Sequence, residues 1–527
     1  MKKKKLLYIV LFILGLVLYT AFLYHRISRI PCNSDTANMI LEADSILHGN
    51  LFLSDWHLTG ITFFTTDLPF FVIGVLIAGV SVQAGYIAIT LMYVFMILAA
   101  LLLIKGKRDN LLNFLVFAGI ALIPSTFTLD AARVHTALFA LAFIAIYFAA
   151  KALEEPKKKY YILFGIFTAL AVCGDYLGLV VITVPILLLC IANKVKKPIQ
   201  LAIATLVGTA GGVVLEHVFL LLGNANKNSL LAGFFLPINE IGDSIILYIR
   251  SMTHMMNANF FGKELFSIKT PIFAIRVLLL LFVFYIMAVQ IRKLFRSDGK
   301  TCFVSTTLSL SFAILTAFML LTEFGPSLTS ARYILYFPTV AAILIVLYYR
   351  EKNIYEQKFY ENRLPVKMLI GVLSVTMLGA CYFVKVPPSS HTVFNRLTEF
   401  LQEESLTNGY ATFWDASIVT VLSQDQVKVR AIESDEKGLQ PQYWFCQNNW
   451  YDEYANFLIL RDREAKEEGE FFKQHNVVTT RLDFGFKDGI SQSEANQAFG
   501  EPDRVLTFEN YRILVYEYDI STKLNKR

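Results

Sequence analysis

The residues best suited to chemistry lie in a polar stretch between the first two hydrophobic segments of the chain. It runs from Asp35 to Pro69 and contains acidic residues, two histidines and a tryptophan. Neighbouring membrane helices are usually joined by a few residues, so a stretch of this length does more than connect. Asp35 opens an amphipathic segment, DTANMILEADSILHG, which Gly49 ends as a helix C-cap would. We expect a short helix in the membrane interface with a carboxylate in its first turn.

A second carboxylate, Asp130, lies where one apolar segment ends and the next begins, followed closely by Arg133 and His135. Two carboxylates that approach one pocket suit glycosyl transfer, because one takes a proton from an acceptor hydroxyl and the other orients that acceptor or a metal. Aspartate is also a favoured helix N-cap, and either carboxylate could do no more than that. We predict catalytic roles for Asp35 and Asp130, and substrate-binding roles for Arg133 and His135.

Four further ionisable or aromatic residues lie near the ends of apolar segments. Arg332 and Tyr333 open one such segment, where a guanidinium suits bidentate contact with phosphate or simply extends to the interface. Glu216 and His217 lie inside an apolar run, and ionisable groups in membrane helices are costly and often functional. We treat all four as candidate donor-phosphate or substrate-binding residues, whereas Asp175 in CGDYLG is expected to be a turn residue.

The sequence leaves a metal requirement open. Asp55, His57 and Asp67 share the opening polar stretch and could bind a divalent cation, but they lack ligand spacing on a regular element. The six cysteines show no paired spacing that would indicate a zinc site or a disulfide framework. No Walker loop, GxGxxG motif or HExxH motif is present, which argues against soluble nucleotide-binding or zinc-protease chemistry.

Composition predicts a polytopic membrane protein. The 527 residues are 55% hydrophobic and 17% charged, whereas soluble domains are about 25% charged. The net charge of +6 does not indicate a nucleic-acid partner, because the basic residues cluster at the ends of apolar segments. The basic start Met1–Lys5 and the apolar run Leu6–Tyr24 are interpreted as an uncleaved anchor, since no small-residue cleavage site follows.

Apolar length and basic clusters together predict the topology. Leu68–Val80 is too short to span, and treating it as an interfacial or re-entrant segment leaves every basic cluster on one side. The positive-inside rule then gives a cytoplasmic N-terminus and about eleven spans, with the loop 223–270 and the C-terminus outside. The predicted spans are 6–24, 82–104, 110–127, 132–150, 160–174, 176–192, 198–222, 271–291, 302–322, 333–349 and 366–384.

The chain divides into two predicted parts. Residues 1–386 form a transmembrane domain whose outer catalytic loop is 25–81, and residues 387–527 form a soluble, extracytoplasmic α/β domain. Alternating apolar residues in QVKVRAI and YRILVYEY predict strands, and GEPDRVLTFENYRILVYEYD predicts a turn followed by a β-hairpin. Helical patterns cover 392–404 and 491–499.

Four motifs together resemble the GT-C class of polyprenyl-phosphate-dependent glycosyltransferases, in particular the protein O-mannosyltransferases and the aminoarabinose transferases that modify lipid A. SDTANMILEADSILHGN is similar to the first outer loop of these families and places Asp35 at their catalytic position. LDAARVHTALFALAFIAIYF matches a second acidic position with Asp130. ARYILYFPTVAAIL is similar to a late helix start and matches it with Arg332, Tyr333 and Pro338.

Two positions depart from the family pattern. The families often have a second acidic residue directly after the catalytic one, where this chain has Thr36. TTDLPFFVIGVLIAG resembles their dipping segment but has Leu68-Pro69 in place of a Pro-Pro pair. The resemblance therefore leaves open which residue takes the companion role, and whether the role of the Pro-Pro pair applies to this chain.

The resemblance implies inverting transfer of a sugar from a polyprenyl-phosphate donor to a hydroxyl of a cell-surface glycan, lipid or protein, without nucleic acid. Asp35 would be the general base, and Arg332 would bind the leaving phosphate with Arg133 and Arg276 behind it. A divalent metal is the one cofactor left open, and the bacterial plasma membrane is the implied location. Tryptophans of the outer domain, Trp414, Trp444 and Trp450, could stack on sugar or acceptor.

Two alternatives remain beside the transferase. A transporter or flippase of lipid-linked intermediates predicts charged residues near mid-membrane and pseudo-repeated halves, and the sequence displays neither pattern. A polymerase of such intermediates would use the same carriers, with its chemistry in a large late loop rather than in the first one.

Overall fold

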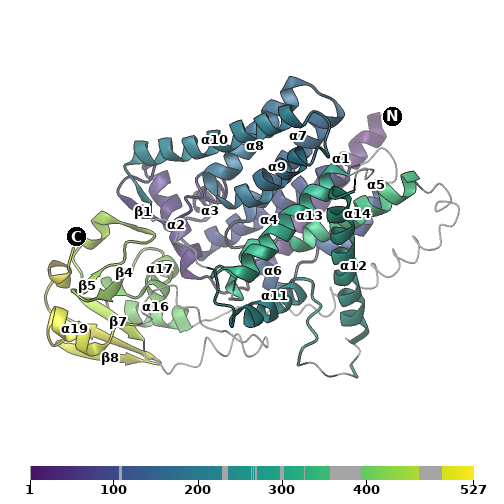
Figure 1. Cartoon of the computed structure of the whole chain (residues 1–527). Coiled ribbons are helices and arrows are strands. Elements are labelled where there is room, and N and C mark those ends of the chain that lie inside the picture. Colours follow the sequence, from purple (N-terminus) through teal and green to yellow (C-terminus); the bar gives the residue numbers. More distant parts are fainter. Residues whose placement is uncertain are drawn as a thin grey trace.

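The protein is mostly helical, as expected of a polytopic membrane protein. The computed structural model describes residues 2–105, 110–227, 235–262, 264, 266–267, 270–296, 302–325, 327–355, 393–461 and 489–526. Within these residues, seven helices are long and apolar enough to cross a membrane (Figure 1). They are α1 (Lys2–Ile27), α4 (Val82–Ile104), α7 (Thr136–Glu154), α10 (Pro198–Gly223), α12 (Thr270–Leu294), α13 (Phe303–Leu321) and α14 (Phe337–Tyr355), the last preceded by the 3₁₀ segment η2 (Thr329–Ile334).

Shorter helices connect these seven. They are α2 (Ser34–Leu47), α3 (Leu68–Ala78), α5 (Asn110–Ala121), α6 (Thr126–Ala131), α8 (Lys158–Gly174), the π-helical segment η1 (Leu179–Thr183), α9 (Val184–Ile191) and α11 (Ile241–Met255). The two predictions around the polar stretch are confirmed: α2 opens with Asp35 in its first turn, and α3 is a separate apolar helix too short to span. Gly49 follows α2 with φ +97°, the left-handed conformation that favours glycine after a helix end.

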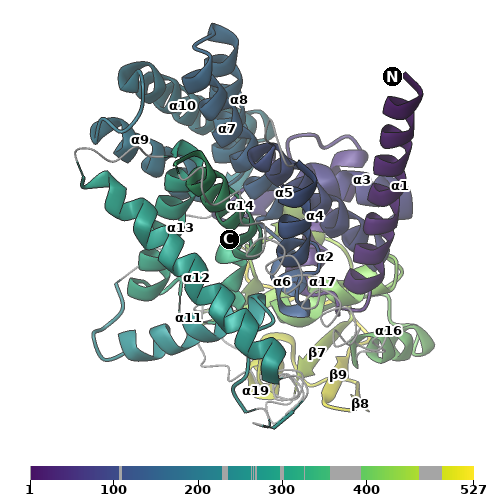
Figure 2. The same ribbon diagram turned by 90° about the vertical axis from the view of Figure 1, so that its right-hand side faces the viewer.

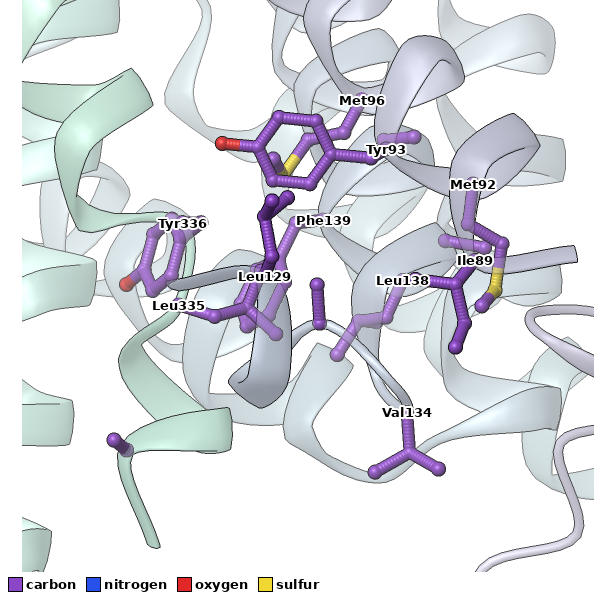
Figure 3. Close-up of a cluster of buried hydrophobic side chains, with 14 of the residues drawn as sticks. Ile89, Met92, Tyr93, Met96, Leu129, Val134, Leu138, Phe139, Leu335 and Tyr336 are labelled. Carbon is purple, nitrogen blue, oxygen red and sulfur yellow. The ribbon is translucent and has the colours of Figure 1, made fainter. Parts of the chain in front are cut away.

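The core of the helical part lies where α4, α7 and the start of α14 meet. Tyr336 stacks on Phe139 of α7 with ring centroids 4.2 Å apart and an interplanar angle of 10°. Figure 3 shows these two rings among apolar side chains, with Tyr93 of α4 above them. Helices that are apolar all round are stable only when other apolar groups cover them, so this cluster holds the segments on which the candidate residues lie.

Four predicted spans are not among the seven helices. The prediction 110–127 corresponds to α5 and α6 with a break between them, because Pro124 cannot donate a backbone hydrogen bond and Ser125 caps α6. The predictions 160–174 and 176–192 correspond to α8, which has 17 residues, and to the joined segments η1 and α9. The prediction 366–384 lies outside the described residues.

The loop 223–270 contains a helix that the sequence analysis did not predict. This helix, α11, has 15 residues and packs against α6 and α13. Its apolar residues Ile241, Ile245, Tyr248 and Met252 recur at helical spacing, so the pattern for this helix is present in the sequence although the loop was not predicted to contain one.

The C-terminal part contains a six-stranded sheet of order β5-β4-β3-β7-β9-β8. Strand β3 is parallel to β4 and β7, and the remaining pairs are antiparallel, including the predicted hairpin of β8 and β9. The strands are β3 (Asn408–Ala411), β4 (Lys428–Asp435), β5 (Gly438–Pro441), β7 (Phe457–Arg461), β8 (Arg504–Phe508) and β9 (Tyr511–Val515), and the helices are α16 (Val393–Glu403), α17 (Phe413–Leu422) and α19 (Gln492–Phe499).

A small second sheet connects the two parts of the chain. In it β1 (Trp56–Leu58) pairs in parallel with β2 (Asn226–Lys227) and in antiparallel with β6 (Cys446–Gln447). The stretch that follows α2 is thereby hydrogen-bonded both to the end of α10 and to the C-terminal part. Figures 1 and 2 show the C-terminal part lying against α2 at one end of the helices.

The close approach of α3 to α4 generates a stability prediction. A Cβ added to Gly74 would lie 2.2 Å from the carbonyl oxygen of Ala84, so the two backbones must move apart. We expect Gly74→Ala to lower the free energy of unfolding by about 1–3 kcal/mol, measured by thermal unfolding in detergent. Gly15→Ala in α1, where nothing lies within 4 Å, is the matched control and should be neutral or slightly stabilising. Equal effects of the two substitutions would contradict this packing.

Candidate active site

Asp35 is not the residue that caps α2. Asn33 occupies the N-cap position, and its side chain accepts a hydrogen bond from the backbone N–H of Thr36 at 3.0 Å. Asp35 follows in the first helical turn, where the helix dipole favours a negative charge. Asp35 therefore does not serve as the helix N-cap, and its side chain instead contacts another segment of the chain.

That contact is with Arg332 of η2, which lies 297 residues away in the sequence. One carboxylate oxygen of Asp35 accepts a hydrogen bond from Arg332 Nη1 at 3.3 Å. The side chain of Asp35 is 17% exposed and that of Arg332 is 26% exposed, so the pair is partly open. The guanidinium also lies over the ring of Tyr333 at 5.3 Å, and Arg332 Nε is buried without a hydrogen-bond partner in the described part of the chain. The arginine thus keeps donors that a ligand can engage.

Behind this pair lies a buried polar network. The ring of His135 is 5.2 Å from the ring of Tyr333, and its Nδ1 is 2.6 Å from a carboxylate oxygen of Asp175. Asp67 accepts the backbone N–H groups of His135 and Ala137 at 2.6 and 2.8 Å. These N–H groups belong to the first turn of α7, so a residue from the opening stretch caps that helix.

Asp130 and Arg133 form a local ion pair instead of joining this network. Arg133 Nε donates to the Asp130 carboxylate at 2.9 Å, and Nη2 contacts the same oxygen. Arg133 also lies close to Cys32, whose thiol has its pKa raised to about 12 by burial and which directly precedes the start of α2. The described residues contain no hydrogen bond or ion pair between Asp35 and Asp130. Helix α6, which carries Asp130, packs on η2, which carries Arg332.

Glu216 and His217 lie in a different environment. Glu216 is buried and binds Lys227 Nζ at 2.7 Å and the hydroxyl of Tyr176. The Lys227 ammonium in turn lies 4.2 Å from the centre of the Tyr176 ring. His217 is exposed, with Nδ1 2.9 Å from the carbonyl oxygen of Val213 in its own helix. Glu216 and His217 thus have hydrogen-bond partners of their own, apart from the network around His135. Tyr176, which binds Glu216, directly follows Asp175 of that network in the sequence.

The three candidate metal ligands Asp55, His57 and Asp67 do not come together at one site in the described part of the chain. Asp67 is engaged with α7, whereas His57 Nε2 lies 2.8 Å from the side-chain oxygen of Asn448 and its ring packs on Tyr443. Asp55 uses its backbone carbonyl to accept from the Asn448 N–H at 3.0 Å. Within the described residues, no three His, Cys, Asp or Glu side chains are grouped as a metal site would need. His57 and Asp55 instead attach the opening stretch to the C-terminal part.

The C-terminal part contacts the Asp35 helix directly. Ser417 of α17 donates a hydrogen bond to the side-chain oxygen of Asn38, one turn after Asp35, at 2.6 Å, and both residues are buried. Trp450 packs edge-on against Trp56 with centroids 5.0 Å apart, and the Arg430 guanidinium lies 4.1 Å from the Trp450 ring. Trp450 is thus occupied by protein contacts. Sequence patterns did not indicate Asn38 or Ser417, because each is meaningful only through the other.

Glu42 is a buried carboxyl that the sequence analysis did not single out. It is 1% exposed, and neither of its carboxyl oxygens has a hydrogen-bond partner among the residues that the structure describes. Burial raises the pKa of Glu42 well above its usual range. Glu42 lies seven residues after Asp35 and therefore on the same face of α2, and that spacing is the signal that could have found it.

The residues predicted from sequence therefore fall into three groups. Asp35, Arg332, Tyr333 and His135 come together with Asp67, Asp130 and Arg133 form a separate local pair, and Glu216, His217, Asp55 and His57 make contacts elsewhere. No family model matches this chain, and no curated protein is detectably similar to it.

Burial of Asp67 generates a pH prediction. Burial, the largest influence, raises the pKa of this carboxyl from 3.8 to about 6, with Asp175 acting in the same direction and His135 and its hydrogen bonds opposing. The folded protein then binds the proton more tightly than the unfolded chain. This contribution to stability is therefore complete below about pH 4 and is lost as pH rises through about 6. We expect a decline on the order of 2–3 kcal/mol over that interval.

The measurement is the thermal unfolding midpoint between those two pH values, for the wild type and for Asp67→Asn. The asparagine cannot ionise, so the decline should flatten in the variant even if its stability is lower throughout. An unchanged slope in Asp67→Asn would assign the pH dependence to other groups.

The unpaired carboxyl of Glu42 generates a second prediction. Replacing a buried polar group that has no partner by an apolar one removes a desolvation cost without breaking a bond. We expect Glu42→Leu to keep or raise the unfolding midpoint. The control is Asn38→Leu, one turn away, which leaves Ser417 unpaired and should cost about 1–3 kcal/mol. Strong destabilisation by Glu42→Leu would reveal a structural role for the carboxyl.

Proposed function

We propose that this protein is a membrane glycosyltransferase that moves a sugar from a polyprenyl-phosphate donor to a hydroxyl acceptor with inversion. The observation that carries the proposal is the partly open pair of Asp35 and Arg332, 3.3 Å apart. It brings a carboxylate suited to take a proton next to a guanidinium suited to bind phosphate. That juxtaposition agrees with the resemblance of the motifs around both residues to GT-C enzymes.

In the proposed reaction, Asp35 accepts the proton of the acceptor hydroxyl as the oxygen attacks the anomeric carbon. The bond between that carbon and the phosphate oxygen breaks, and the polyprenyl phosphate leaves with the bonding electrons as a stable anion. No general acid is needed for such a leaving group, and positive charge stabilises it instead. Attack from the face opposite the phosphate inverts the anomeric centre.

Arg332 has two partners in this scheme. It holds Asp35 before the donor binds, and the donor phosphate then competes for the guanidinium and releases the carboxylate to act as a base. The ring of Tyr333 lies 5.3 Å from the guanidinium and helps to hold it, whereas Arg133 is already paired with Asp130. Arg276 is less suited to this role, because its Nη1 donates to the carbonyl oxygen of Met256 at 2.9 Å.

The proposed topology extends the seven apolar helices to about eleven spans with a cytoplasmic N-terminus, based on the positive-inside rule. The site and the C-terminal part then lie on the outer side of the plasma membrane. The contacts of α17 with α2 and of β6 with β1 support this arrangement, because they require the C-terminal part to be on the same side as Asp35.

The decisive experiment is sugar transfer by Asp35→Asn in purified, detergent-solubilised protein supplied with polyprenyl-phosphate sugars and membrane acceptors. Loss of a general base should lower transfer by about 10²-fold or more while donor binding persists. Asp44→Asn is the matched control, since it alters a carboxylate on the same helix that pairs with His48 instead of Arg332.

Full transfer by Asp35→Asn would remove the assignment of the base. Movement of intact lipid-linked sugar across vesicles without cleavage would replace the transferase by a flippase. Repeated addition of whole lipid-linked units would indicate a polymerase.

A further inference from the structure

The helix α11 is apolar on its outer side as well as on its inner side. Its inner side buries apolar residues, among them Leu247, Met252 and Met255. Its outer side carries Ile245, Ile246 and Ile249, which are 41, 52 and 46% exposed. We call these three residues the isoleucine face. A helix on the surface of a water-soluble protein normally directs charged and polar residues outward, so this face indicates a second apolar surrounding.

Exposed apolar residues continue beyond α11 in both directions along the chain. Ile238 before the helix is 89% exposed, and Phe260 and Phe261 after it are 46 and 42% exposed. They lead to α12, where Leu278 and Leu281 are 64 and 59% exposed. Figure 2 shows α11 beside α12, one of the seven membrane-length helices. Exposed apolar residues thus occur on α11, on both sides of it along the chain and on the membrane-length helix α12, as a lipid-facing surface requires.

The inner side of α11 rests on the two elements that flank the candidate site. Leu247 packs against Leu328, directly before η2, and against Phe127 of α6. Thr128 of α6 donates a hydrogen bond to the carbonyl oxygen of Met255 at 3.3 Å. Whatever binds the outer side of α11 thus supports both the Arg332 segment and the Asp130 segment.

We propose that α11 is an interfacial helix whose isoleucine face binds the surface of the lipid bilayer. Fifteen residues extend about 22 Å as an α-helix, which is too short to cross the roughly 30 Å hydrocarbon layer. Asp243 and Arg250 flank the face and suit the headgroup region, where charged residues beside a buried apolar face are common. The lipid surface is the occupant, and the helix transmits that anchoring to α6 and η2. Any effect of this anchoring on the sugar donor rests on the proposed function, whereas the binding of α11 to lipid does not.

The test is tryptophan quenching in phosphatidylcholine vesicles that carry bromine on the acyl chain, either near the headgroup or near the chain end. Ile246→Trp adds one fluorophore, and its signal is obtained by subtracting that of the wild type with its four native tryptophans. We expect shallow bromines to reduce this signal at least about twofold and deep bromines to reduce it less, since interfacial helices penetrate only about 5–10 Å. Ile249→Trp should give the same result.

The matched control is Glu436→Trp, at an exposed turn between β4 and β5. Its signal should respond to iodide in the water and not to brominated lipid. Quenching of Ile246→Trp by iodide alone would overturn the proposal by placing the face in water. Quenching by neither agent would show that protein covers it, and stronger quenching by deep bromines would show that the segment inserts more deeply. The measurement needs no catalytic activity, so its failure is separate from failure of the proposed function.

Discussion

The contact between Asp35 and Arg332 is the interaction on which the candidate site depends. A carboxylate and a guanidinium at a water-poor boundary each carry a desolvation cost, which their mutual contact offsets only if both segments are held firmly. The structure meets that condition by fixing the Asp35 helix between α3, α4 and α17, and by placing η2 against α6 and α13. The remaining exposure of the pair leaves room for a ligand to take over one of the two partners.

The polar network behind the pair also consists of buried groups whose desolvation cost must be offset by contacts within the protein. His135, Asp175 and Asp67 are buried, and their principal polar atoms find partners within the protein, as buried polar groups must. Asp67 serves the start of α7, so the polar stretch after α2 contributes to the fold beyond any chemistry it performs. Glu42 departs from this rule, because its buried carboxyl has no hydrogen-bond partner among the described residues and lies on the same helix face as Asp35.

The C-terminal part holds the opening stretch in place by direct contacts. Two segments of the C-terminal part make these contacts: residues 446–451 pair with β1 and pack Trp450 on Trp56, and Ser417 of α17 binds Asn38. Together they restrict the helix that carries Asp35 and the strand that follows it. A domain that contacts the Asp35 helix in this way contributes to the geometry of the candidate site.

The sequence by itself determined the features that local chemistry controls. Apolar length located the seven helices that are long and apolar enough to cross a membrane, although it also predicted four further spans. The first-turn position of Asp35 and the end at Gly49 defined α2, and alternation predicted the β8–β9 hairpin. Arg332 and Tyr333 were identified by their place at the start of an apolar segment. Only the tertiary structure decided that Arg332 contacts Asp35, that Asp67 caps α7, that Asp130 pairs locally with Arg133, and that α11 has two apolar sides. These outcomes depend on which segments meet in space, and residue periodicity reports the face on which a side chain lies but not the partner it finds there.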